Sequence, residues 1–179
     1  MDALSRAVVL RREREGADAV ADLEALERQL ATVDFDADGV QHGFLKLPIS
    51  TDESAWGAVM IPVTVVKNGE GPTALLTGGN HGDEYEGITS LLKLSSALKA
   101  EEVTGRVIIV PCMNTPAVMA GKRTSPMDKG NLNRSFPGAA GSGPTRALAG
   151  FVTRHLLPAA DLVMQRKVTI RLTSTMRTK

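Results

Sequence analysis

A histidine and a glutamate lie three residues apart in the sequence GGNHGDEYEG, which spans residues 78–87. An apolar run at 74–76 precedes them, so a buried strand is expected to end just before His81 and Glu84. A glycine-rich turn after a strand lets an imidazole and a carboxylate point to one place outside the sheet. These are two of the three protein ligands of a catalytic zinc site of the two-histidine, one-glutamate type. The same spacing also arises by chance in ordinary surface pairs.

A second group of polar residues lies in the sequence DKGNLNRSFPG at 128–138. Asn133 is followed directly by Arg134, and this pair suits a clamp for a substrate carboxylate. The guanidinium would form a bidentate ion pair and the amide would add a directional donor. The alternative is a loop that is held only by its own side-chain to backbone hydrogen bonds. Near the first pair, Asp83 and Glu86 could cap the following helix or support a ligand.

The elements that must position these residues are those of an α/β protein. Apolar runs predict strands at 44–48, 57–66, 73–77 and 107–110, and the start of another at 162–164. Helical periodicity predicts helices at 86–98 and 145–157. The first of these helices is expected to bury Ile88, Leu91, Leu92 and Leu98. A strand, a helix and a strand in succession imply a crossover between parallel strands, and the long polar stretch at 113–144 is typical of a functional loop.

Composition excludes several classes of function. The net charge is +1 and aromatic residues make up 3% of the 179 residues, which argues against a nucleic-acid surface. No apolar run approaches the roughly 18 residues of a membrane span. Cys112 is the single cysteine, so an intrachain disulfide is impossible and a reducing, cytoplasmic location is the default. We expect Cys112 to belong to the core.

Three other polar features predict structure rather than chemistry. The aspartate-rich segment at 34–39 begins like a calcium loop, but Leu45 stands at the twelfth position, which must be glutamate, so a turn is expected. His155 is expected to be an ordinary histidine of the helix at 145–157. His42 has no partner at ligand spacing.

The succession GGNHGDEYEG, RVIIVP with Asn114 and Pro116, and DKGNLNRSFPG resembles the succinylglutamate desuccinylase and aspartoacylase family. These are zinc-dependent deacylases related to the metallocarboxypeptidases. The resemblance extends over residues 45–164, with separated motifs in the right order. Within the family, the run at 56–87 is most similar to deacetylases that act on N-acetyl-diaminobutyrate in bacterial ectoine breakdown. The implied fold is the N-terminal part of a zinc-carboxypeptidase-like mixed sheet flanked by helices.

The resemblance also implies roles for five residues. His81 and Glu84 would be zinc ligands, and Asn133 with Arg134 would hold the carboxylate of a small N-acyl amino acid. Arg123 would polarise the scissile carbonyl and stabilise its oxyanion, although Lys122 lies beside it. The zinc ion would act as a Lewis acid on the amide and lower the pKa of water toward ~7.

One expected ligand has no counterpart. The family's third ligand is a histidine in an aspartate-x-histidine sequence at the end of the next strand, whereas residues 165–167 read Gln-Arg-Lys. The family's downstream general-base glutamate has no counterpart either. The sequence therefore predicts one zinc ion that lacks its third protein ligand, and an inactive remnant or a binding module of the same fold is the alternative to a working deacetylase.

The last fifteen residues, 165–179, differ from the rest of the chain. They hold five of the 21 basic residues and no acidic residue, which leaves 16 basic against 20 acidic residues elsewhere. Such a tail could bind a polyanion, but the lost strand pattern favours an interrupted reading frame. The expected organisation is therefore a helical segment at 1–40, the N-terminal part of a catalytic domain at 41–164 and an aberrant basic tail at 165–179.

Overall fold

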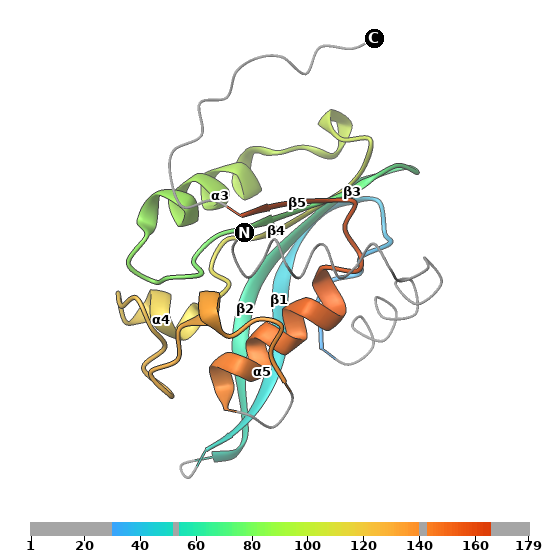
Figure 1. The fold of residues 1–179 in the computed structure, drawn as a ribbon. Coiled ribbons are helices and arrows are strands. Elements are labelled where there is room, and N and C mark those ends of the chain that lie inside the picture. Colours follow the sequence, from blue (N-terminus) through green and yellow to red (C-terminus); the bar gives the residue numbers. More distant parts are fainter. Residues whose placement is uncertain (1–29, 52–53, 140–142, 166–179) are drawn as a thin grey trace.

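The structure, a computed structural model, describes residues 30–51, 54–139 and 143–165. A mixed sheet with helices on both faces forms the centre of this part of the chain (Figure 1). Its spatial order is β1-β2-β4-β3-β5. The strands are β1 (Gly39–Thr51), β2 (Ser54–Asn68), β3 (Thr73–Thr77), β4 (Gly105–Val110) and β5 (Leu162–Gln165). The predicted α/β class is confirmed, and each predicted strand is present.

Two kinds of pairing make up the sheet. β1 and β2 form a long antiparallel hairpin, and β2 continues antiparallel onto β4. β3 lies parallel to β4, with Leu75 opposite Ile108, and parallel to β5, with Leu75 opposite Val163. The carboxyl ends of β3, β4 and β5 therefore lie at the same edge of the sheet.

Helix α3 (Tyr85–Ala97) connects β3 to β4, as the crossover prediction required. Figure 1 shows α3 on one face of the sheet and α5 (Pro144–Phe151) on the other. The main core lies on the α5 face, where alternate residues of β1 and β2 pack against α5 and the π-helical turn η3 (Val152–Leu156). No residue of β3 is exposed: Thr73, Leu75 and Thr77 are buried and the two residues between them are partly buried, as expected for a strand whose faces are both covered.

The apolar side of α3 differs from the prediction at two positions. Leu98 follows the last residue of the helix and is only partly buried. Ile88, Leu91 and Ser95 are buried, whereas Leu92 is 44% exposed. Positions 88, 91 and 95 follow the i, i+3, i+7 spacing that lies along one line of a helix, and Leu92 falls on its outer flank. The sequence predicts Leu92 in the core because it is apolar. The rotation of the helix about its axis instead directs its side chain away from the sheet.

Within the polar stretch predicted at 113–144, the described residues 113–139 are more ordered than the sequence indicated. It contains the short helix α4 (Thr115–Met119) and the 3-10 turn η2 (Leu132–Arg134). Leu132 is fully buried in the main core and anchors this turn. Residues 113–139 are therefore held in place, with one apolar side chain among polar neighbours as the anchor.

Other expectations concern the beginning and end of the chain. The aspartate-rich segment is a turn as predicted, because Asp34 Oδ1 accepts the backbone N–H groups of Asp36 and Ala37 at 2.9 and 3.1 Å. Of the helical segment expected at 1–40, residues 1–29 lie outside the described residues, and residues 30–40 form a bridge and turns that lead into β1 and no helix. Of the basic tail expected at 165–179, only Gln165 is described. Within the part of the chain that the structure describes, no helix is long and apolar enough to cross a membrane.

Two leucines test the assignment of the core. Leu75 is completely buried on β3, so Leu75→Ala should lower the free energy of unfolding by about 2–5 kcal/mol through lost burial and a cavity. Leu92→Ala is the matched control, because its side chain is largely exposed, and it should change stability by less than about 0.5 kcal/mol. Urea unfolding measures both, and equal losses would contradict the helix phase described above.

Candidate metal centre

The loop after β3 is held to the loop after β4 by backbone hydrogen bonds. Gly78 N donates to Val110 O, Met113 N donates to Gly78 O and Asn114 N donates to Gly79 O, each at 2.9 Å. Gly82 lies against α4, where an added Cβ would be 2.1 Å from the backbone of Ala117. Only a residue without a side chain fits this approach. The backbone therefore fixes the position of the residue between these glycines, His81.

His81 and Glu84 come together as their spacing predicted. His81 is fully buried, and its Nδ1 lies 2.8 Å from Glu84 Oε1. Glu84 is the residue before α3 and makes no capping hydrogen bond with that helix. Its carboxylate is therefore directed to the imidazole and not to the helix end.

Asn131 fixes which histidine nitrogen carries hydrogen. Asn131 Oδ1 accepts the backbone N–H of Asn133 at 3.2 Å, so this oxygen is an acceptor, and it lies 3.1 Å from His81 Nε2. His81 Nε2 must therefore be the donor, which leaves a lone pair on Nδ1 in the neutral ring. Two acceptors, Nδ1 and the Glu84 carboxylate, then face each other at 2.8 Å. Such a pair needs a shared proton or a metal cation, and its donor set of one nitrogen and one oxygen suits zinc.

Sequence reasoning missed Asn131, although a signal was present. Asn131 and Asn133 are two residues apart on either side of Leu132, and Leu132 is buried in the core. A buried residue between two asparagines indicates that both amides lie on the opposite side of the turn. Imidazole ligands commonly donate their other N–H to such an oxygen, which orients the ring.

Arg123, rather than Lys122, reaches the pair. Arg123 Nη1 donates to Glu84 Oε1 at 3.3 Å, and the Arg123 side chain is 55% exposed. Lys122 is exposed and contributes its backbone, since Gly82 N donates to Lys122 O at 3.0 Å. The structure therefore brings the predicted arginine next to the predicted ligands.

Asn133 and Arg134 lie on η2, at the side of the same loop. Asn80 Nδ2 donates to Asn133 Oδ1 at 3.2 Å, which ties the predicted clamp to the residue before His81. Arg134 is exposed, and its side chain forms no hydrogen bond or ion pair with the described residues, whereas its backbone N–H donates to Asn131 O at 3.0 Å. Its guanidinium fork is thus open to a bidentate partner.

The sheet edge beside the pair carries buried polar atoms without partners among the described residues. These are Thr77 Oγ1, Asn80 Oδ1 and Gln165 Nε2, and Thr77 stands opposite Gln165 in the β3–β5 register. Unsatisfied buried polar atoms are uncommon in native proteins and call for a ligand, water or ion. This edge is therefore built to receive a polar group.

A third ligand of the usual kind is not present in the described ranges. There, no three residues of the His, Cys, Asp and Glu types form a group that could hold a metal ion. His42 Nδ1 is bonded to Thr64 Oγ1 at 2.9 Å on the β1–β2 hairpin, and the His155 ring packs on Phe151 with centroids 5.1 Å apart. Burial raises the pKa of the Cys112 thiol, which disfavours a thiolate ligand.

The expected auxiliary carboxylates have no such role. Asp83 and Glu86 are exposed, and no side chain caps α3. Asp128 acts instead, at the base of the η2 loop. Its carboxylate accepts Gly130 N at 2.9 Å, Thr145 N at 2.8 Å and Thr145 Oγ1 at 2.6 Å. Asp128 therefore caps the first turn of α5 from a distance and fixes the start of the loop that carries Asn131.

The fold and this edge define a class of protein. A mixed sheet flanked by helices, with the histidine–glutamate pair at the carboxyl ends of its parallel strands, is the zinc-carboxypeptidase-like fold of the structures that the chain matches. Residues 70–165 match the succinylglutamate desuccinylase/aspartoacylase catalytic domain. The chain belongs to this family.

Individual relatives are close in sequence and structure. N-alpha-acetyl-L-2,4-diaminobutyric acid deacetylase of Halomonas elongata is 76% identical over 134 residues, which cover 75% of this chain and 39% of that protein. The product-bound ectoine utilization protein EutE (DoeB) of Ruegeria pomeroyi superposes with a TM-score of 0.73 and 61% identity, over 75% of this chain and 41% of that one. A succinylglutamate desuccinylase/aspartoacylase of Rhodobacter sphaeroides gives a TM-score of 0.71 and 49% identity, over 74% and 41%. The chain thus spans about two-fifths of the length of these relatives.

Asp128 gives the site a predicted dependence on pH. Partial burial raises the pKa of this carboxyl, but the hydrogen bonds from Thr145 and Gly130 outweigh it and hold the pKa below its usual value. A lowered folded-state pKa gives stability that is present above the unfolded-state pKa and is lost as pH falls through the folded one. Asp128→Ala should therefore destabilise the chain at pH 7 by about 1 kcal/mol, as loss of a helix cap does.

Thermal unfolding of the native chain and of Asp128→Ala from pH 7 down to pH 3 measures this effect. The difference in Tm should shrink toward the acid end, because the native carboxyl becomes protonated there. Asp83→Ala is the control, since that carboxylate is exposed and unbonded, and it should leave Tm nearly unchanged. A difference for Asp128→Ala that stays constant with pH would refute the role of its charge.

Proposed function

We propose that the chain carries part of the active site of a zinc-dependent deacylase that cleaves the amide bond of an N-acyl amino acid. The observation that supports it most is the geometry of His81, whose Nε2 is directed to Asn131 while Nδ1 and the Glu84 carboxylate face each other at 2.8 Å. The similarity to the deacetylase of Halomonas elongata favours N-acetyl-L-2,4-diaminobutyrate as the substrate. The reaction would be a deacetylation in ectoine catabolism.

His81 Nδ1 and Glu84 would hold the metal ion. When bound, zinc supplies Lewis-acid polarisation of the amide carbonyl and makes water a stronger nucleophile near neutral pH. Asn131 keeps the imidazole turned so that its lone pair faces the Glu84 carboxylate. The backbone bonds of Gly78 and Gly79 fix the start of the loop that carries both residues.

Three residues would act on the substrate. Arg123 has its guanidinium beside Glu84, where it would stabilise negative charge that develops on the carbonyl oxygen. Arg134 presents an open guanidinium fork, and Asn133 is fixed by Asn80, so together they would bind the substrate carboxylate. Contacts from Arg123 to the carbonyl oxygen and from Arg134 to the carboxylate would hold the amide bond beside the His81–Glu84 pair.

A second candidate function is ligand binding without turnover. The observation that favours it is the lack of a third ligand group within the described residues. A metal held by one imidazole and one carboxylate binds more weakly than one with a complete set. The chain would then keep the carboxylate clamp and lack efficient hydrolysis.

Zinc binding and acetate release test the proposal together. The chain should bind zinc, and His81→Ala should weaken that binding by at least about tenfold because it removes one of two strong ligands. His42→Ala is the matched control, because His42 belongs to the β1–β2 hairpin, and it should leave the affinity unchanged. Isothermal titration with zinc measures the affinity, and acetate released from N-acetyl-L-2,4-diaminobutyrate measures turnover.

The outcomes separate the candidates. Zinc binding that depends on His81, together with acetate release, supports the deacetylase. Zinc binding with no acetate release favours the binding module. Equal losses in His81→Ala and His42→Ala would overturn the metal site itself.

Asn131 provides an independent test of the imidazole geometry. Asn131→Leu removes the acceptor for His81 Nε2 and should lower the zinc affinity about 10–100-fold, as loss of such supporting partners does. Asn133→Leu keeps the backbone N–H at position 133 and should leave the zinc affinity nearly unchanged, while it weakens binding of N-acetyl-L-2,4-diaminobutyrate. If the two variants lose zinc equally, Asn131 has no specific role.

A further inference from the structure

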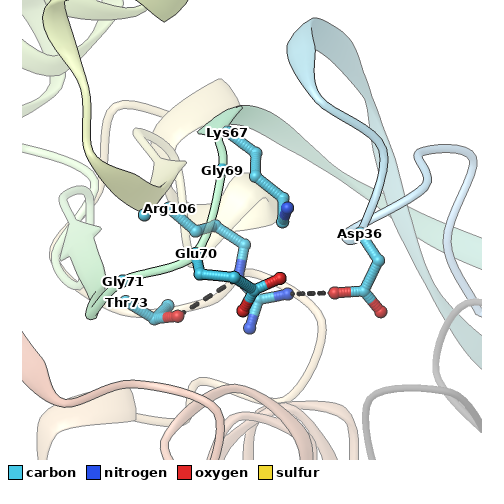
Figure 2. A pocket seen from close by; sticks show the side chains of 8 residues that line it. Asp36, Lys67, Gly69, Glu70, Gly71, Thr73 and Arg106 are labelled. Atoms are coloured by element: carbon cyan, nitrogen blue, oxygen red, sulfur yellow. Dashed lines mark hydrogen bonds and ion pairs between the residues drawn. The ribbon is translucent and has the colours of Figure 1, made fainter.

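A second polar cavity lies at the other end of the sheet from the candidate metal centre. It has a volume of about 230 Å³ and opens between the β2–β3 turn, the start of β4 and the aspartate-rich turn before β1 (Figure 2). Thr73 begins β3 at this cavity, whereas the strand reaches the His81 loop at Thr77. The four residue steps between them correspond to roughly 13 Å. The cavity is thus separate from the proposed deacylase site, and the inference below does not depend on that function.

Two cations lie side by side at its wall. Lys67 and Arg106 are direct partners in the antiparallel β2–β4 pairing, so their side chains leave the same face of the sheet. Their side chains are 14% and 12% exposed. Like charges at directly opposed positions destabilise a sheet, and buried cations need partners. This arrangement therefore places two cations, each of which needs acceptors, side by side at the wall of the cavity.

The charges are only partly satisfied by the protein. Arg106 Nη1 donates to Asp36 Oδ1 and to Phe35 O, each at 3.0 Å, and its Nε donates to Thr73 Oγ1 at 3.2 Å. Lys67 Nζ donates to Asp38 Oδ1 at 3.0 Å. Within the described residues, Arg106 Nη2 and the other two ammonium hydrogens of Lys67 have no acceptor. Both residues line the cavity.

A carboxylate completes the lining. Glu70 stands on the exposed β2–β3 turn and forms no ion pair or hydrogen bond with the described residues. Figure 2 shows the side chains of Lys67, Glu70 and Arg106 extending toward one space, with Asp36 on its other side. Open donors and an open carboxylate thus border the same small volume. A simple anion would satisfy the donors and leave Glu70 unpaired beside it, whereas a simple cation would do the reverse.

We propose that this cavity binds a small zwitterion of the α-amino-acid class, with its carboxylate on Lys67 and Arg106 and its ammonium on Glu70. The volume supports a metabolite of this size, since it is below the roughly 300–1,000 Å³ of pockets for drug-sized ligands. Charge-assisted hydrogen bonds at both ends supply affinity and orientation. Asp36 remains on Arg106 and keeps the guanidinium in place.

Titration of the full chain with three matched probes tests the proposal. L-alanine carries both charges, propionate carries only the carboxylate and ethylamine carries only the ammonium. Chemical-shift changes in ¹H–¹⁵N spectra give each Kd and show whether the shifts lie at Gly69, Glu70 and Gly71. L-alanine should bind with a Kd of about 1 mM or tighter, and each single-charge probe at least about tenfold more weakly.

Two variants and a control identify the contacts. Glu70→Gln should lower the affinity for L-alanine about tenfold and leave the affinity for propionate unchanged, because it removes only the partner of the ammonium. Lys67→Met should weaken the binding of both L-alanine and propionate. Lys93→Met, on the exposed surface of α3, should leave both affinities unchanged. The Glu70 side chain is exposed and has no hydrogen bond or ion pair within the described ranges, so Glu70→Gln should leave the fold intact. Equal binding of propionate and L-alanine, or no shifts at the turn, would overturn the proposal.

Discussion

The parallel pairing of β3 with β4 is the constraint on which the candidate site depends. Residues 73–77 lie in register with 106–110, so both strands end at the same edge and release their loops side by side. The loops then continue the pairing through the hydrogen bonds of Gly78 and Gly79. Because α3 returns the chain across one face, this register brings residues of the 78–84 loop, α4 and the η2 loop within reach of each other. Without it, His81 and Asn131, which are 50 residues apart, would not meet.

Polar bonds across this edge form a short chain from metal ligand to substrate clamp. Glu84 contacts His81, His81 contacts Asn131, and Asn131 caps the turn that carries Asn133 and Arg134. Asn80, the residue before His81, donates to Asn133, which gives a second link between the two loops. Hydrogen bonds that share partners hold each member in one orientation. The parts that would bind metal and the parts that would bind substrate are therefore positioned by the same network.

Much of the fold was predictable because its signals are local. A strand–helix–strand unit with parallel strands is predicted by the apolar runs of β3 and β4 and by the glycine-rich turn before α3. The succession of motifs indicated the family. The exposure of Leu92 was not predictable from composition, because it depends on a few tens of degrees of helix rotation against the sheet. Asn131 was missed for another reason, since its role depends on a contact with a residue distant in sequence. Arg123 was named through the family resemblance, whereas its contact with Glu84 depends on the path of the loop.

The ties that position His81 are made almost entirely by main-chain atoms, with glycines where the chains approach closely. Main-chain bonds do not depend on the identity of the side chains that project from the same residues. The backbone path of this loop is therefore set independently of its side chains, provided that the glycines stay. The arginines that would meet the substrate, Arg123 and Arg134, lie outside the loop, so redesign of substrate preference can begin with them and leave the loop that carries His81 and Glu84 intact.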